Sequence, residues 1–118
     1  MAMNILGTDL VACSTDPMTG FFRDGCCNTT ADDRGMHTIC AVMSEAFLAY
    51  SKAQGNDLST PMPTYEFPGL KEGDRWCLCL SRWVEAYQAD CAPNVVLEAT
   101  HASATEFIDL ATLQQFAV

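Results

Sequence analysis

Basic residues are scarce in this chain: six lysines and arginines stand against fifteen aspartates and glutamates, and the net charge is −9. A protein that binds nucleic acid needs a basic face toward the phosphates, and six cations predict none. The same sign of charge disfavours binding to an anionic membrane surface. We therefore expect no nucleic-acid partner and no membrane partner, and we interpret the acidity as a source of solubility.

Long apolar runs are also missing. Residues 1–7 have neither the basic region nor the apolar run of a signal peptide. No stretch approaches the roughly 20 apolar residues of a membrane span. We therefore predict a cytoplasmic protein, in which thiols stay reduced. The chain has the length of one domain and is 49% hydrophobic, which predicts a single domain over residues 1–118 with a true core.

Several catalytic signatures are absent from the sequence. It contains no Gly-rich phosphate loop, no Gly-x-Ser-x-Gly elbow and no His-Glu-x-x-His helix. Histidine occurs only at His37 and His101. These absences disfavour several large enzyme classes.

Cysteine, in contrast, is abundant, with seven in 118 residues. Outside the cell such a chain would be a disulfide framework, and inside it would hold metal, redox-active or simply buried cysteines. The odd count and the missing leader both argue against complete pairing. We predict mainly free thiols.

Cys77 and Cys79 lie two residues apart in an apolar run, so on a strand their thiols would share one face. A metal could then be completed by two ligands from Cys26, Cys27, Cys40 or His37. The spacing differs from the Cys-x₂₋₄-Cys pairs of zinc ribbons and fingers. We therefore favour buried core thiols that need no cofactor, with a zinc site of Cys26, Cys27, Cys77 and Cys79 as the weak alternative.

Cys26 and Cys27 differ because they follow a polar turn that begins at Arg23. The guanidinium could lower the pKa of a thiol and produce a nucleophile or a redox sensor. Both cysteines are therefore candidate catalytic residues. The alternative is that both are tucked under the loop.

Two long segments are rich in turn residues, over 12–36 and 55–75. Both exceed the usual connection of about 4–6 residues, and long ordered loops are often functional. We expect the aromatic groups Phe21-Phe22 and Phe67-Pro68 to anchor these loops on the core. Arg75 is a candidate ligand-binding residue, or else pairs with Asp74 to fix the second loop.

The remaining chain repeats a pattern of apolar run, hydroxyl cap and helix. The runs cover 38–43, 76–80 and 95–99, and each is followed by a Ser or Thr that suits a helix N-cap: Ser44, Ser81 and Thr100. A last helix should begin after Asp109. The second and third runs, joined by about ten helical residues, predict a βαβ unit. We predict an α+β fold, a two-layer α/β sandwich with a small mixed sheet and two long ordered loops.

Several segments resemble the family of the domain of unknown function 2237. They include GFFRDGCCNT at 20–29, HTICAVM at 37–43, FPGLKEGDRWCLC at 67–79 and APNVVLEATH at 92–101. The likeness runs from about Asn4 to Val118. The resemblance implies a small soluble bacterial protein of the α/β type. It implies no activity and no catalytic or binding residues.

A third candidate site follows from the expected parallel strands, because ligands bind beyond the carboxyl ends of such strands. Ser44, Ser81 and Thr100 would lie along that edge, and helix N-termini there favour an anion. His101 could act as a general base, and Arg82 could clamp a carboxylate or phosphate. The alternative is that these residues only cap helices or face solvent.

Two functions remain open at this point. The first is a binding or enzymatic protein with a polar pocket for a small anion, with His37 among its ligand-binding candidates. The second is a non-enzymatic structural module that responds to thiol oxidation or to metal. They differ in whether the thiols and histidines converge on one cavity.

Overall fold

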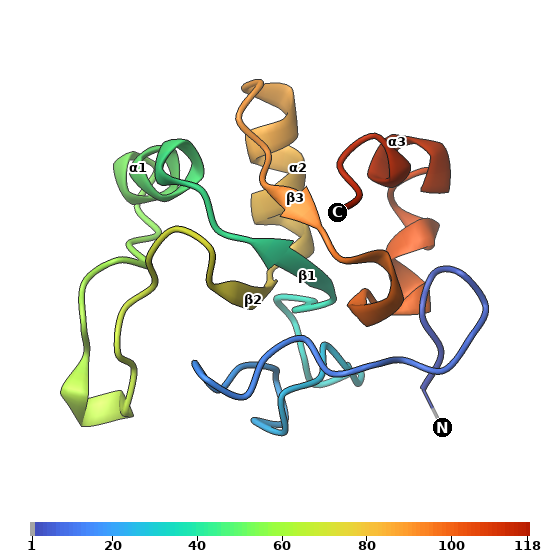
Figure 1. Cartoon of the computed structure of the whole chain (residues 1–118), viewed down its shortest axis with the longest axis horizontal. Coiled ribbons are helices and arrows are strands. Elements are labelled where there is room, and N and C mark those ends of the chain that lie inside the picture. The colour runs from blue at the N-terminus through green and yellow to red at the C-terminus, as the bar shows by residue number, and fades with distance from the viewer. Residues whose placement is uncertain (1) are drawn as a thin grey trace.

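The computed structural model describes residues 2–118 and is an α+β protein, as predicted. Its strands are β1 (Ile39–Val42), β2 (Arg75–Leu78) and β3 (Asn94–Val95). Its α-helices are α1 (Glu45–Ala53), α2 (Leu80–Gln88) and α3 (Leu110–Gln114). Short 3₁₀ helices cover Pro63–Tyr65, Leu97–Ala99 and Ala102–Glu106. The three α-helices lie on one side of the sheet, and the N-terminal segment lies on the other (Figure 1).

The sheet has the order β2-β1-β3, and β1 pairs antiparallel with both neighbours. The prediction of a mixed sheet is therefore wrong for the named strands. Strands β2 and β3 do run in the same direction, but β1 lies between them, so the predicted βαβ unit exists in split form. The connection from β1 to β2 is long enough for β2 to pair with β1 in either a parallel or an antiparallel direction, and the sequence pattern does not distinguish the two.

The helix ends follow local rules where the deciding residues are local. Ser44 caps α1, because its hydroxyl accepts from the Phe47 amide at 3.1 Å. Gly55 follows the end of α1 with φ of +91°, a conformation that favours glycine. The other two predicted caps are wrong. Helix α2 starts two residues earlier, with Cys79 at the N-cap, and the buried Thr100 hydroxyl instead donates to the Val96 carbonyl and accepts from the Cys40 amide.

The two faces of the sheet carry different side chains. Alternation along β1 turns Ile39 and Ala41 toward the helices and Cys40 away from them. On the helix side the core includes Phe47, Trp83 and Leu113, each 0–1% exposed. The other face holds a smaller buried cluster, made mostly of sulfur and short side chains: Cys13, Cys27, Cys40, Cys77, Val96 and Ala99.

Two disulfides tie the first long loop to this second face. Cys13 bonds Cys40 of β1, and Cys27 bonds Cys77 of β2. The prediction of mainly free thiols is therefore wrong for four of the seven cysteines. The physical reason is non-local: Cys40 and Cys77 are direct cross-strand partners, and the loop crosses above them.

The long loops are present where predicted, but their expected anchors are only partly right. Phe67 packs edge-to-face on Trp76 with ring centroids 5.3 Å apart. Phe21 and Phe22 instead contact each other and remain 39% and 49% exposed. The disulfides do the anchoring expected of this pair. Within residues 2–118, none of the helices is both long enough and apolar enough to cross a membrane.

Candidate active site

Cys79 lies where strand β2 passes into helix α2. It is partly exposed, carries a free thiol and occupies the N-cap position of the helix. Its carbonyl accepts from the Arg82 and Trp83 amides, at 3.1 Å each, which fixes the first turn. The positive end of a helix dipole stabilises a negative charge placed there. The fold therefore holds this sulfur at a position suited to a thiolate.

A pocket of about 340 Å³ opens beside Cys79. Its walls come from the first long loop, from β2 and from the start of the second long loop. The lining residues are Thr19, Gly20, Phe21, Arg23, His37, Asn56, Leu58, Trp76, Cys77, Leu78 and Cys79. Both a free cysteine and a histidine therefore face one cavity.

His37 stands between Cys79 and a buried carboxylate. Its Nδ1 lies 2.6 Å from Oδ1 of Asp33, and the ring lines the same pocket as Cys79, whose thiol acts to raise the pKa of His37. Gly35 makes room for this contact: a Cβ there would lie 2.8 Å from Cε1 of His37 and 3.3 Å from Sγ of Cys79. The absence of a side chain at position 35 allows the imidazole to reach the sulfur.

The pKa of His37 is raised from its ordinary value to about 9. The hydrogen bond to Cys79 is the largest cause. Burial of the ring opposes it, and the hydrogen bond to Asp33 and the nearby charges add to the rise. At neutral pH the ring is therefore an imidazolium, and an imidazolium beside a sulfur stabilises a thiolate.

Asp33 is only 3% exposed and is held by three hydrogen bonds. Besides the ring, the His37 amide donates at 2.9 Å and the Thr29 hydroxyl at 3.0 Å, both to Oδ2. Burial acts to raise the pKa of this carboxyl, but the bonds from His37 and Thr29 outweigh it and lower the pKa. The carboxylate stays charged and fixes the orientation of the imidazole.

Cys79, His37 and Asp33 thus form a nucleophile, a base and a group that orients the base. This is the arrangement by which enzymes activate a weak nucleophile. Cys79 comes from a strand–helix junction, and the other two residues from the end of the first long loop. The array is assembled by tertiary contact, and it opens into a pocket.

The pocket has the opposite electrostatic character to the chain as a whole. None of the fifteen Asp and Glu residues lines it, whereas Arg23 and His37 both do. The Arg23 guanidinium lies over the Trp76 ring, with Cζ 5.6 Å from the ring centroid. Asn56 adds a side-chain amide to the wall. This lining suits a ligand that carries negative charge.

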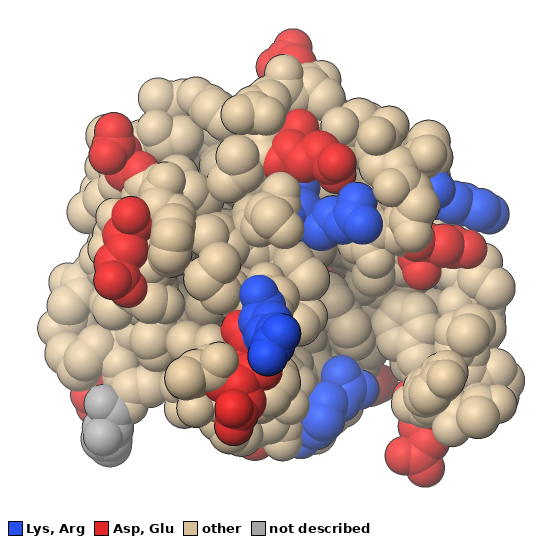
Figure 2. All heavy atoms as spheres, turned by 180° about the vertical axis from the view of Figure 1, so that it is seen from behind, with Lys and Arg blue, Asp and Glu red and all other residues tan. Residues whose placement is uncertain are grey.

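Two basic side chains outside the pocket pair with acidic neighbours. Lys71 pairs with Asp74 at 3.1 Å, and Arg82 pairs with Glu85 at 3.3 Å. Figure 2 shows one face of the molecule on which blue and red side chains are interleaved rather than gathered into one basic patch. The expected Asp74–Arg75 pair is replaced by the Lys71–Asp74 pair, and Arg75 is exposed.

The sheet edge predicted from the hydroxyl caps does not come together as argued. Because β1 runs opposite to β2, Ser44 at the end of β1 lies at the other edge from Ser81. The pocket beside Cys79 is lined by neither of them, nor by Arg82 or His101. Arg82 instead contacts Glu85 and the Gln54 carbonyl, each at 3.3 Å.

His101 sits in a local network of its own. Its Nδ1 lies 2.9 Å from the Ser103 hydroxyl, and burial lowers the pKa of the ring. Its amide donates to the Thr38 carbonyl at 2.9 Å, beside β1. Of the two histidines, His37 therefore shares a pocket with a free cysteine, Cys79, and His101 does not.

The cysteines of the weak zinc alternative are split among three environments. Cys27 and Cys77 are bonded to each other and buried. Cys26 is a free thiol in the loop, and burial, with the Asp24 charge, raises its pKa. Cys79 faces His37. Of these four, Cys79 alone has the surroundings of a nucleophile.

Sequence reasoning missed Asp33 and favoured Cys79 as a buried core thiol, with a zinc site as the weak alternative, whereas Cys79 is partly exposed. A signal for Asp33 existed, because it precedes His37 by four residues in a turn-rich loop where an aspartate readily bonds the backbone. No comparable signal joined His37 to Cys79. Their contact depends on the path of the loop over the sheet.

A family model described as "Uncharacterized protein conserved in bacteria (DUF2237)" matches residues 3–117. The match covers nearly the whole chain and agrees with the resemblance found in the sequence. No curated protein matches the chain.

Proposed function

We propose that this chain, which belongs to the DUF2237 family, is a cysteine-dependent enzyme that acts on a small anionic carbonyl compound. One observation carries the proposal: Cys79, His37 and Asp33 form an activated-nucleophile array at the wall of a pocket. A histidine that only filled the core would have no reason to join a buried carboxylate to a partly exposed thiol.

The reaction would begin with attack of the Cys79 thiolate on a carbonyl carbon, which moves the C=O π electrons onto oxygen. When the tetrahedral species collapses, the leaving group departs with a proton from the His37 imidazolium, and a thioester remains on Cys79. Neutral His37 then takes a proton from water while the hydroxide adds to the thioester. Release of the acid restores the thiolate, and Asp33 orients the imidazole throughout.

In this proposal, Arg23 is the residue that makes the pocket prefer an anionic substrate. It is the one arginine in the pocket lining, and its position over the Trp76 ring places the guanidinium at the wall. A guanidinium binds a carboxylate through two parallel hydrogen bonds. The substrate would therefore carry a carboxylate or similar group at one end and the reacting carbonyl at the other.

The test compares two p-nitrophenyl esters, one with a short acyl chain ending in a carboxylate and one with the same chain capped as a methyl ester. We expect nitrophenolate release with a thioester on Cys79, and none from Cys79→Ala. Arg23→Gln should reduce kcat/KM for the carboxylate ester by about tenfold, the low end for a charge-assisted hydrogen bond, and leave the capped ester unchanged. Arg34→Gln, outside the pocket lining, is the matched control. Equal acylation of Cys79→Ala and the wild type would refute the proposal.

A second candidate is a thiol sensor without turnover. It is favoured by the Cys27–Cys77 disulfide, because Cys77 lines the same pocket as Cys79. The Cys79 thiolate could then attack that disulfide, forming a bond to Cys27 or Cys77 and releasing the other cysteine as a thiolate. Non-reducing peptide mapping should in this case find a disulfide between Cys79 and Cys27 or Cys77, and neither ester should be hydrolysed.

We also propose a cytoplasmic location, since a nucleophilic Cys79 must remain reduced. Cell fractionation with an antibody to the protein tests this location.

A further inference from the structure

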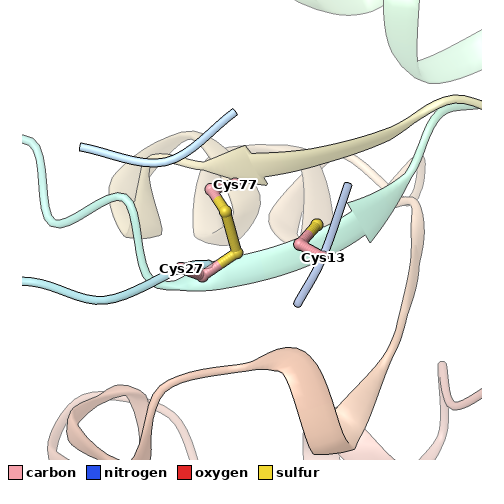
Figure 3. Close-up of side chains that lie close together, drawn as sticks. All are labelled: Cys13, Cys27 and Cys77. Carbon is pink, nitrogen blue, oxygen red and sulfur yellow. A yellow bond between two sulfur atoms is a disulfide. The ribbon is translucent and has the colours of Figure 1, made fainter. Parts of the chain in front are cut away.

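The buried face of the sheet opposite the helices gathers four sulfur atoms. Cys13 and Cys27 come from the loop, and Cys40 and Cys77 face each other across β1 and β2. All four are between 0% and 5% exposed. Figure 3 shows Cys13 beside the Cys27–Cys77 disulfide, so the two disulfides are neighbours rather than separate links.

The sulfur atoms also lie close enough together to bind one metal ion when they are not paired as disulfides. The Sγ atoms of Cys13, Cys27 and Cys77 lie within 4.8 Å of one another, and Cys40 is bonded to Cys13. A tetrahedral zinc ion with Zn–S of about 2.3 Å separates its sulfurs by about 3.8 Å. The sulfurs of Cys13, Cys27 and Cys77 are therefore close enough to share one ion, and the Cys40 side chain would turn toward them to complete the site.

We propose that, in the reduced protein, Cys13, Cys27, Cys40 and Cys77 bind one zinc ion as four thiolates. Two equivalents of a dithiol reductant together supply four electrons and four protons, which open the two disulfides to four thiols. Zn²⁺ then displaces the four thiol protons. Oxidation reverses the sequence: two S–S bonds form, four electrons pass to the oxidant and Zn²⁺ leaves.

Because all four cysteines are buried, the zinc site would be a structural one. Structural zinc sites have four protein ligands and no open position, whereas catalytic sites keep a position for water. The ligands come from the loop, β1 and β2, so zinc would hold the same three segments together that the disulfides hold. The site uses none of Cys79, His37 and Asp33, although Cys77 also lines the pocket beside Cys79.

The test is metal analysis of protein purified under reducing, chelator-free conditions. We expect about one zinc per chain, as in other four-thiolate sites, and the visible absorption of tetrahedral cobalt thiolate after exchange with Co²⁺. Cys91→Ser and Cys79→Ala should keep the metal. Cys13→Ser should lose most of it. Because Cys13→Ser could also fail to fold, a second measurement uses the wild type: oxidation should release zinc together with formation of the Cys13–Cys40 and Cys27–Cys77 bonds.

Two results would overturn the proposal. One is reduced wild-type protein that takes up no zinc or cobalt when titrated. The other is zinc that persists after both disulfides have formed, or that is lost from Cys91→Ser or Cys79→Ala, because the metal would then be held elsewhere.

Discussion

Replacing His37 with glutamine should slow the alkylation of Cys79 at neutral pH. With a pKa of about 9, roughly 99% of His37 rings carry a proton at pH 7, against roughly 24% for a ring at the ordinary value of about 6.5. A neighbouring cation favours the reactive form of a thiol, so we expect this charge to speed the reaction of Cys79 in the wild type. Glutamine keeps a polar side chain of similar length and removes the charge.

The size of the effect follows from thiolate content. An ordinary cysteine with a pKa of about 8.5 is roughly 3% thiolate at pH 7, so a fully ionised thiol has up to about a 30-fold larger reactive fraction. Thiolates of lower basicity are weaker nucleophiles, which reduces the advantage. We therefore expect alkylation of Cys79 by iodoacetamide to slow by about tenfold in His37→Gln.

The assay contains its own controls. Peptide-resolved mass spectrometry measures all three free cysteines in one sample, and burial, with nearby carboxylates, raises the pKa of both Cys26 and Cys91. Cys79 should react first in the wild type, and the other two should keep their rates in the variant. His101→Gln should behave as the wild type. An unchanged Cys79 rate in His37→Gln would refute the reasoning.

Three further predictions concern the same framework. Gly35→Ala should slow the Cys79 reaction while the fold is kept, because its Cβ would displace the His37 ring; circular dichroism and alkylation rates separate the two effects. In the oxidised protein, replacing Cys27 and Cys77 together by serine should lower the free energy of unfolding by about 4 kcal/mol, from closure of a loop of 50 residues, as measured by urea denaturation. The raised pKa of His37 should contribute stability that is complete below pH 6.5 and is lost as the pH rises toward 9. The lowered pKa of Asp33 should contribute stability that is lost in acid. Denaturation curves measured across pH should show both dependences weakened in Asp33→Asn.

Features of the fold that depend on neighbouring residues could be predicted from the sequence. Ser44 and Gly55 bound α1 because a hydroxyl cap and a positive φ are local requirements. The apolar runs located β1 and β2 to within a residue or two. Direction and pairing could not be predicted, because they depend on where the long connections carry the chain.

In the candidate site, too, local contacts could be predicted from the sequence and long-range contacts could not. The Asp33–His37 contact spans four residues and could be inferred from a turn-rich loop. The contact of His37 with Cys79 joins residues far apart in the sequence and depends on the path of the first long loop over the sheet, to which the disulfides tie it. Cys79 also owes its position at the start of α2 to the turn that its carbonyl anchors, whereas hydroxyl preference alone favoured Ser81.

The central claim is that His37 is a charged partner of Cys79, and the pH titration of its ring nitrogens by ¹⁵N NMR tests it most directly. We predict a protonated ring at pH 7 with a transition near pH 9. In Cys79→Ala the transition should move down toward the ordinary histidine value, because the largest cause of the shift is removed. A wild-type His37 that titrates near pH 6.5, or one whose transition is unchanged in Cys79→Ala, would contradict the account.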